Sequence, residues 1–215
     1  MRFEEALHLP TAEYFTPEQA KISLRDVALV SMEATAKTNA VSNIPVIGTF
    51  GFGPCTVLIL YDREQSKTAI LRHDGAIHKK DLNLLLRRIR KNRELRLEAH
   101  IFGVEIVNYR AAKCRQDTVD YLESLLENLE KAGNIEIKTF DVFTKPHPVA
   151  VAIDTRTGTI IKGSDLIVTS SENETAHDYF ADWPLADLGV DFNGAVPQER
   201  KRKVNGPVRA WQLKL

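Results

Sequence analysis

An unbroken apolar segment at residues 56–60 (TVLIL) most constrains what this chain can fold into. The segment is too short for a typical helix, and its β-branched residues favour a strand that is buried on both faces. Polar residues 62–67 follow, and residues 68–72 (TAILR) are predicted to return as a second strand. The two strands form a hairpin, which places Cys55 at the start of one strand and His73 at the end of the other.

Further strands are predicted from apolar alternation and β-branched content. In residues 95–102 one side carries Leu95, Leu97, Ala99 and Ile101, and the other carries Arg96, Glu98 and His100. The remaining predicted strands are residues 26–32, 135–142, 148–154 and 159–162. Residues 35–43 are small and polar, so we expect a loop there.

Two helices are predicted from apolar residues at helical spacing. The first covers residues 82–93 with Asp81 as its N-cap, and the second opens at Asp117 or Thr118 and ends before Gly133. Strands outnumber helices and do not alternate regularly with them. The pattern therefore predicts an α+β fold, with a mixed β-sheet or β-sandwich core and flanking helices.

The charge balance and the length of the apolar runs argue against two classes of partner. The 215 residues contain 29 Lys and Arg and 29 Asp and Glu, so the formal net charge is zero. Nucleic-acid binding proteins usually carry a basic excess, so we expect no nucleic-acid partner. No apolar run approaches the roughly 20 residues that span a bilayer, so we expect no membrane insertion. The sequence gives no prediction of the oligomeric state.

Cysteine content bears on the compartment. Cys55 and Cys114 are the two cysteines, too few for a disulfide framework, and the first 20 residues contain no apolar block typical of a signal peptide. We therefore expect a cytoplasmic protein, with delivery to a host cytosol by specialised secretion as the alternative. No His, Cys or Asp cluster has the spacing of a zinc site, and no complete phosphate-binding motif is present, so we expect no metal and no cofactor.

Cys55 is the strongest candidate for a chemical role. Gly51, Gly53 and Pro54 precede it, and this combination predicts a stiff bend that presents one side chain at the end of a strand. The Cys55 N–H is then a candidate oxyanion donor. The alternative is that Cys55 is a small buried apolar residue, as many single cysteines are.

His73 and Thr49 are the candidate partners of Cys55. An imidazole beside a thiol can lower the thiol pKa and accept its proton. The second ring nitrogen then needs an acceptor, which is either the Thr49 hydroxyl or the Thr49 main-chain carbonyl. The alternative roles are a structural histidine and an ordinary strand threonine.

The other histidines are weaker candidates. His78 lies five residues after His73 and is an alternative base. His100 is on the polar side of its strand, where it either lines a cleft or is solvated. His147 lies between two prolines and has no expected role.

The segments TFGFGPCTVLILYD (residues 49–62) and TAILRH (residues 68–73) resemble the signature of the CheD chemoreceptor glutamine deamidases. That signature has Thr-x-Gly-x-Gly-Ser-Cys, an apolar strand ending in Asp, and a His at the end of the next strand. The motif thus includes Thr49, Gly51, Gly53, Cys55, Asp62 and His73, listed here in chain order. Residues 96–103 are also similar to a segment of the protein N-terminal asparagine amidohydrolase. Both families share their fold with the deamidating domain of cytotoxic necrotizing factor.

The resemblance implies a domain at residues 44–170, with an N-terminal extension at 1–43 and a C-terminal extension at 171–215 packed on the core. Its implied catalytic residues are Cys55, His73 and Thr49. We expect Gly53, Pro54, Asp74 and His100 to contact the substrate. Pro54 replaces the usual Ser, and Gly103 is followed by Val104, where the families carry two glycines. This second region shapes the substrate groove in such folds.

The implied activity is that of a cysteine-dependent amidohydrolase. It would hydrolyse the side-chain carboxamide of Gln or Asn in a protein substrate and release ammonia. One alternative is removal of ammonia from an N-terminal Asn, with Asp74 or Glu98 binding the α-amino group. Transglutamination would result if an amine replaced water. A further alternative is a catalytically inactive binding module with the same fold.

Overall fold

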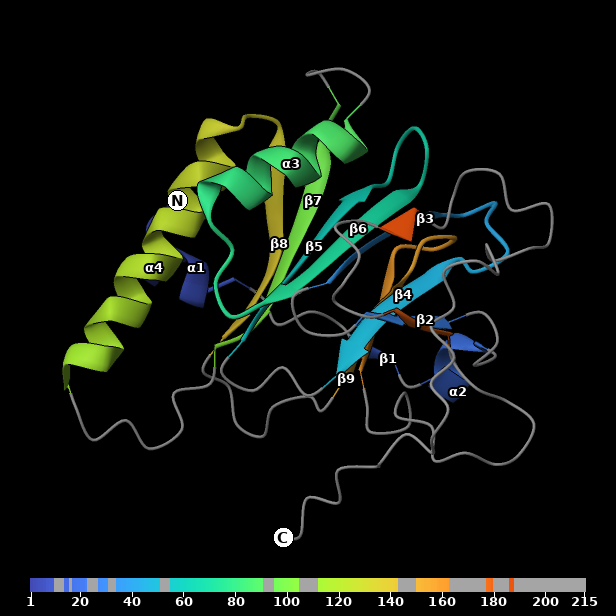
Figure 1. Ribbon diagram of the computed structural model, residues 1–215, viewed down its shortest axis with the longest axis horizontal. Helices are drawn as coiled ribbons and strands as arrows, with labels where there is room; N and C mark the ends of the chain where they lie inside the picture. The colour runs from blue at the N-terminus through green and yellow to red at the C-terminus, as the bar shows by residue number, and fades with distance from the viewer. Residues whose placement is uncertain are drawn as a thin grey trace, which may run out of the picture.

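The computed structural model describes residues 1–9, 14–15, 17–22, 27–30, 34–50, 55–90, 95–104, 112–142, 150–162, 177–179 and 186–187. They form an α+β fold with two β-sheets and flanking helices (Figure 1). Helices α3 (Lys79–Ile89) and α4 (Ala112–Lys131) cover one face of one sheet, and the second sheet packs on its other face.

The sheet between the helices and the second sheet is called the central sheet. Its strand order is β12 (Ala186–Asp187), β3 (Thr35–Asn39), β6 (Thr68–Asp74), β5 (Thr56–Asp62), β7 (Leu97–Gly103) and β8 (Ile135–Val142). Strands β3, β6, β5 and β7 pair antiparallel, whereas β7–β8 and β12–β3 are parallel. The hairpin predicted from residues 56–72 is confirmed as β5 and β6.

The second sheet has the order β1 (Tyr14–Phe15), β10 (Thr159–Lys162), β9 (Ala150–Asp154), β4 (Val46–Phe50), β2 (Val27–Val30) and β11 (His177–Tyr179). Strands β10, β9 and β4 pair antiparallel. Residues 1–43 thus supply strands to both sheets, because β2 pairs with β4 and β3 pairs with β6.

Two apolar clusters hold these layers together. The first lies between the helices and the central sheet and includes Leu58 and Leu60 of β5. The second lies between the two sheets and includes Val57, Ile59 and Tyr61 of the same strand. All seven residues of β5 are buried, and the alternating side chains of residues 57–61 enter the two clusters in turn. This explains why residues 57–60 are apolar on both sides of the strand.

Three predicted elements differ from the structure in type or by three residues or more. Residues 35–39 form β3 and not a loop, because pairing with β6 supplies the hydrogen bonds that their polar composition did not predict. Helix α3 begins earlier, with His78 as its N-cap, and the Asp81 carboxylate accepts a hydrogen bond from the His78 N–H at 3.1 Å. Helix α4 begins at Ala112, since residues 112–116 (AKCRQ) contain no helix breaker.

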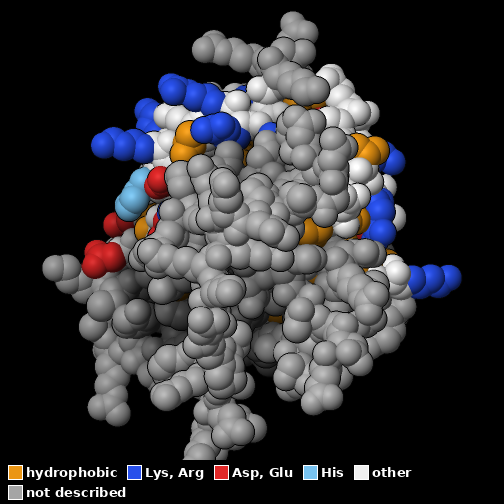
Figure 2. Space-filling view, turned by 45° about the vertical axis from the view of Figure 1, so that its right-hand side comes forward, with side chains coloured by type: hydrophobic (Ala, Val, Ile, Leu, Met, Phe, Trp, Pro, Cys, Tyr) orange, Lys and Arg blue, Asp and Glu red, His pale blue; other side chains and the backbone are white. Residues whose placement is uncertain are grey.

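The short helices α1 (Phe3–Leu7) and α2 (Pro17–Ala20) complete the described fold. Phe3 of α1 packs edge-to-face on Phe140 of β8, which joins the N-terminus to the first cluster. In Figure 2 the visible Lys and Arg side chains lie mostly at the upper left and along the right-hand side of the molecule. Within the described residues, no helix has the length and apolar character needed to cross a membrane.

Candidate functional site

The register of β5 and β6 places Cys55 and His73 on one face of the central sheet. Val57 pairs directly with His73, so their side chains point the same way. Cys55 lies two positions before Val57 and packs against the cluster between the two sheets. Cys55 and His73 are therefore diagonal neighbours across the hairpin, a relation in which Cα atoms are typically about 7–8 Å apart. Cys55 is half-buried, whereas His73 is only 2% exposed.

Thr49 of β4 contacts His73 from the second sheet. The Thr49 Oγ1 lies 2.7 Å from His73 Nδ1 and donates its own proton to the Val30 carbonyl at 2.6 Å. A hydroxyl has one proton, so its oxygen must accept a hydrogen bond from Nδ1–H. Of the two groups that the sequence left open, the contact therefore involves the hydroxyl. The neutral ring then carries no proton on Nε2, and that buried atom has no hydrogen-bond partner among the described residues.

Burial keeps the His73 ring neutral. Desolvation lowers the pKa of His73 to about 4; the Asp74 charge and the Val30 carbonyl oppose this shift, and the Arg72 charge adds to it. At neutral pH the ring therefore has an unprotonated nitrogen able to accept a proton. It is a weaker base than a solvated histidine, because the imidazolium form is disfavoured.

The main chain of Cys55 is held by the end of β7. The Val104 N–H donates to the Cys55 carbonyl at 3.0 Å. Gly103 and Val104 have φ values of 93° and 58°, and this left-handed turn directs the Val104 N–H toward Cys55. A positive φ is rare for a β-branched residue. Val104, which stands where the resembling families have a second glycine, thus has a left-handed backbone.

Asp74 is placed away from the Cys55–His73 face. It follows His73 and pairs with Thr56, so it points to the helix-covered side of the sheet. Its carboxylate forms an ion pair with Arg72, whose guanidinium also donates to Thr35 at 3.2 Å. The expected substrate contact of Asp74 is not supported by this orientation.

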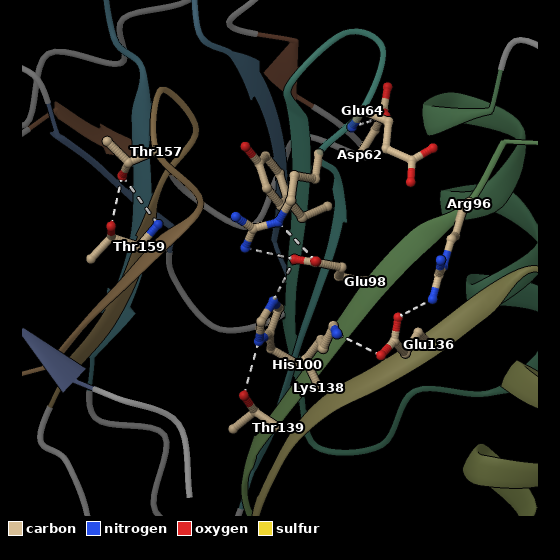
Figure 3. A network of polar contacts seen from close by, with 12 residues as sticks. Asp62, Glu64, Arg96, Glu98, His100, Glu136, Lys138, Thr139, Thr157 and Thr159 are labelled. Carbon is tan, nitrogen blue, oxygen red and sulfur yellow. Dashed lines mark hydrogen bonds and ion pairs between the residues drawn. The ribbon is translucent and has the colours of Figure 1, made fainter. Parts of the chain in front are cut away.

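His100 is buried and not solvated, which corrects one of the two expectations for it. Its Nδ1 lies 3.0 Å from the Thr139 hydroxyl (Figure 3). Desolvation lowers the pKa of His100 to about 3. Its register partner is Ile59, four positions along β5 from Cys55. That separation is about 13 Å at 3.3 Å per residue, so His100 does not lie beside Cys55.

Glu98 is still farther from Cys55, because it pairs with Tyr61 near the other end of β5. Its carboxylate accepts two hydrogen bonds from Arg63, at 2.8 and 3.1 Å. The open cavity beside this pair, about 150 Å³, is lined by three cationic and three acidic side chains: Arg63, Glu64, Arg96, Glu98, Glu136 and Lys138. Its charges compensate one another, and it lies toward the end of β5 opposite to Cys55, on the same face of the central sheet.

Asp62, the acidic residue of the sequence motif, closes the β5–β6 turn. Its buried carboxylate accepts hydrogen bonds from the N–H groups of Glu64, Gln65 and Ser66 at 3.2, 3.0 and 2.8 Å. It lies at the end of β5 opposite to Cys55. We therefore interpret Asp62 as a structural member of the motif.

Tyr121 of α4 is the residue near the site that sequence analysis missed. Its hydroxyl accepts a hydrogen bond from the Ile77 N–H at 2.8 Å and donates one to Thr56 Oγ1 at 3.1 Å. Desolvation raises its pKa. The helical apolar stripe gave no signal for this role, because only the tertiary structure brings Tyr121 to the start of β5.

The other sequence candidates lie outside this group. Gly53 and Pro54 fall outside the described residues, as does His147. His78 is an exposed N-cap on α3. The side chain of Cys114 is also not described. Among the described residues, no group of three or more His, Cys, Asp or Glu side chains is arranged to hold a metal ion.

No protein-family model matches this chain, and no curated protein sequence matches it. The assignment of a function therefore rests on the geometry of Cys55, His73 and Thr49 and on the sequence motif that contains them.

Proposed function

We propose that this protein is a cysteine-dependent amidohydrolase that converts the side-chain carboxamide of Gln or Asn in a protein to a carboxylate. The observation that carries the proposal is the Thr49–His73 contact of 2.7 Å. It fixes the proton on Nδ1 and leaves Nε2 as a proton acceptor on the face that also carries Cys55. An oriented base on the same face as a thiol is a starting arrangement for nucleophilic catalysis, in which the base must come within hydrogen-bond reach of the sulfur.

In the proposed reaction, His73 Nε2 accepts the Cys55 thiol proton as the sulfur attacks the carboxamide carbon. The Cys55 N–H donates to the resulting oxyanion. The C–N bond then breaks, and the imidazolium gives its proton to the departing nitrogen, which leaves as ammonia. Water, deprotonated by His73, attacks the thioester and releases the carboxylate and the restored thiol. Thr49 stays bonded to Nδ1–H throughout and stabilises the transient imidazolium.

The low pKa of His73 determines when the proton moves. An ordinary thiol has a pKa of about 8.5, whereas that of His73 is about 4, so a preformed thiolate–imidazolium pair is unfavourable. We therefore propose that proton transfer accompanies attack on the substrate. A reduced thiol is required, and for this reason we assign the activity to a cytosol, either of the producing cell or of a host cell.

The test is ammonia release from candidate protein substrates, with mass spectrometry to locate the new carboxylate. We expect Cys55→Ser to abolish release, and we expect the matched variant Cys114→Ser to retain it. His73→Gln should lower the rate strongly, whereas His78→Gln, at an exposed histidine, should have no effect. Release that persists in Cys55→Ser would remove Cys55 from the mechanism and refute the proposal.

Removal of ammonia from an N-terminal Asn is less well supported. Asp74 faces the helix side of the sheet, and Glu98 is bound to Arg63 at the far end of β5. Neither carboxylate is therefore beside Cys55 to bind an α-amino group.

The deep burial of His73 favours a second candidate, an inactive binding module. In such a module His73 would be a structural residue that joins the two sheets through Thr49. Alkylation kinetics distinguish the candidates. If His73 serves Cys55, His73→Gln should slow labelling of Cys55 by iodoacetamide, and equal rates in the two proteins would favour the binding module.

A further inference from the structure

We propose that Tyr121 is a positioning residue that sets the placement of Cys55 relative to His73 from behind the central sheet. The inference rests on the proposed function, because it assigns Tyr121 a part in the same reaction. Tyr121 is on α4, which packs on the helix-covered face, whereas Cys55 and His73 face the second sheet. It acts only through the main chain that carries these two residues.

One hydroxyl joins the two chain segments that flank the candidate pair. Tyr121 donates to Thr56, which directly follows Cys55, at 3.1 Å. It accepts at 2.8 Å from the N–H of Ile77, which lies four residues after His73. Thr56 is fully buried and Ile77 is 2% exposed, so water does not readily replace either bond. The hydroxyl therefore ties the start of β5 to the segment that follows β6.

The Cys55–Thr56 peptide is consequently held from two directions. The Val104 N–H binds the Cys55 carbonyl, and the Tyr121 hydroxyl binds the Thr56 side chain. Both contacts act on the main chain at the bend that presents the thiol. A displacement of this bend would move the Cys55 sulfur relative to His73 Nε2, and small misplacements of reacting groups are costly in rate.

The chain offers a matched control in Tyr61. Both tyrosines donate a hydroxyl hydrogen bond to a largely buried partner, and the Tyr61 hydroxyl binds the Thr155 carbonyl at 2.9 Å. Tyr61 is six positions along β5 from Cys55, about 20 Å away at 3.3 Å per residue. Tyr→Phe at each position removes one hydroxyl and keeps the ring.

The experiment compares Tyr121→Phe with Tyr61→Phe in the full chain, by melting temperature, by the kcat and KM of ammonia release, and by iodoacetamide labelling of Cys55. We expect Tyr121→Phe to lower kcat roughly tenfold, with little change in KM, and to change the labelling rate of Cys55. Tyr61→Phe should also lower the melting temperature, though less, because it loses one hydrogen bond where Tyr121→Phe loses two, and it should leave kcat and labelling unchanged. Equal kinetic effects of the two substitutions would overturn the inference, since they would reflect stability alone.

Variants of Thr56 test the same contact from its other end. Thr56→Val removes the hydroxyl that Tyr121 binds and should lower kcat as Tyr121→Phe does, whereas Thr56→Ser keeps a hydroxyl and should retain the rate. In the double variant Tyr121→Phe/Thr56→Val, the kcat losses should not multiply, because both substitutions remove one interaction. Multiplying losses would contradict a shared contact.

Labelling separates this inference from the proposed function. If the wild-type protein releases no ammonia but Tyr121→Phe still alters Cys55 labelling and Tyr61→Phe does not, the proposed function fails and the positioning role stands. If ammonia release depends on Cys55 but is unaffected by Tyr121→Phe, the positioning role is refuted and the proposed function stands.

Discussion

Thr49→Val is the substitution that tests the site most directly, because valine keeps the shape of threonine and removes only its hydroxyl. Two hydrogen bonds are lost, one to the Val30 carbonyl and one from His73 Nδ1–H. At about 1 kcal/mol for each bond, we expect the free energy of unfolding to fall by about 2 kcal/mol. The Val30 carbonyl already interacts with the His73 ring, so Nδ1–H can turn toward it, which limits the loss.

The matched control is Thr38→Val on β3. Thr38 is equally buried, and its hydroxyl donates to the Ile44 carbonyl. Its loss should lower the free energy of unfolding by about 1 kcal/mol through one hydrogen bond, without an effect on His73. In ammonia release we expect Thr49→Val to lower kcat roughly tenfold, since each 1.4 kcal/mol of lost orientation corresponds to a factor of ten, and Thr38→Val to leave it unchanged.

Urea unfolding gives the stabilities, and ¹⁵N NMR of the histidine rings gives the position of the His73 proton without any substrate. At pH 7 we expect His73 of the wild-type protein to carry its proton on Nδ1. A proton on Nε2 would refute the inference that Thr49 accepts a hydrogen bond from the ring. An equal loss of kcat in Thr38→Val would show that the rate follows stability and not the orientation of His73.

Three other predictions concern stability. Burial lowers the pKa of both His73 and His100, so the fold has its full stability above about pH 6.5 and loses stability as pH falls toward 4, where the unfolded chain binds these protons more readily. Unfolding in urea should show a loss of about 2 kcal/mol per ring between pH 6.5 and pH 5, and a pH-independent stability in this range would contradict the burial of the rings. Gly48→Ala should lower the free energy of unfolding by about 1–3 kcal/mol, because the added Cβ would lie 2.6 Å from the Cβ of Ala152. Gly75→Ala, where the added Cβ would meet open space, should change the free energy of unfolding by less than about 0.5 kcal/mol, and thermal melts of the two variants check the difference. Asp62→Ala should lower the free energy of unfolding by about 3 kcal/mol, because it removes the hydrogen bonds that the Asp62 carboxylate accepts in the β5–β6 turn, and it should leave the kcat of the folded protein unchanged. A large loss of kcat without a loss of stability would instead give Asp62 a chemical role.

The strands could be predicted where the order of apolar and polar residues within one segment determines which of its side chains are buried. The apolar run of β5 and the alternation in β7 reflect directly which side chains enter the two clusters. Strand β3 could not be predicted, because its polar residues form a strand only through pairing with β6. The burial of His100 had the same cause: a polar strand face is covered here by a second sheet that local sequence does not reveal.

The candidate site could be predicted in part. The motif spacing indicated Cys55, His73 and Thr49, and the hairpin register explains why the first two share a face. The choice between the hydroxyl and the carbonyl of Thr49 required the position of Val30, which lies 19 residues earlier in the chain. The contact of Tyr121 could be predicted only from the packing of α4 on the sheet. The orientation of Asp74 could be predicted only from knowing which residues of β6 face each side, because a residue next to His73 in a strand points to the opposite side of the sheet.

The Thr49–His73 contact joins β4 of one sheet to β6 of the other, so it forms only when the two layers have come together. A partly folded chain with a complete central sheet would hold Cys55 and His73 as diagonal neighbours on one face while the ring could still rotate. During refolding, the recovery of the proposed ammonia release should therefore lag behind the recovery of β-structure, and the lag would report the time at which the layers dock.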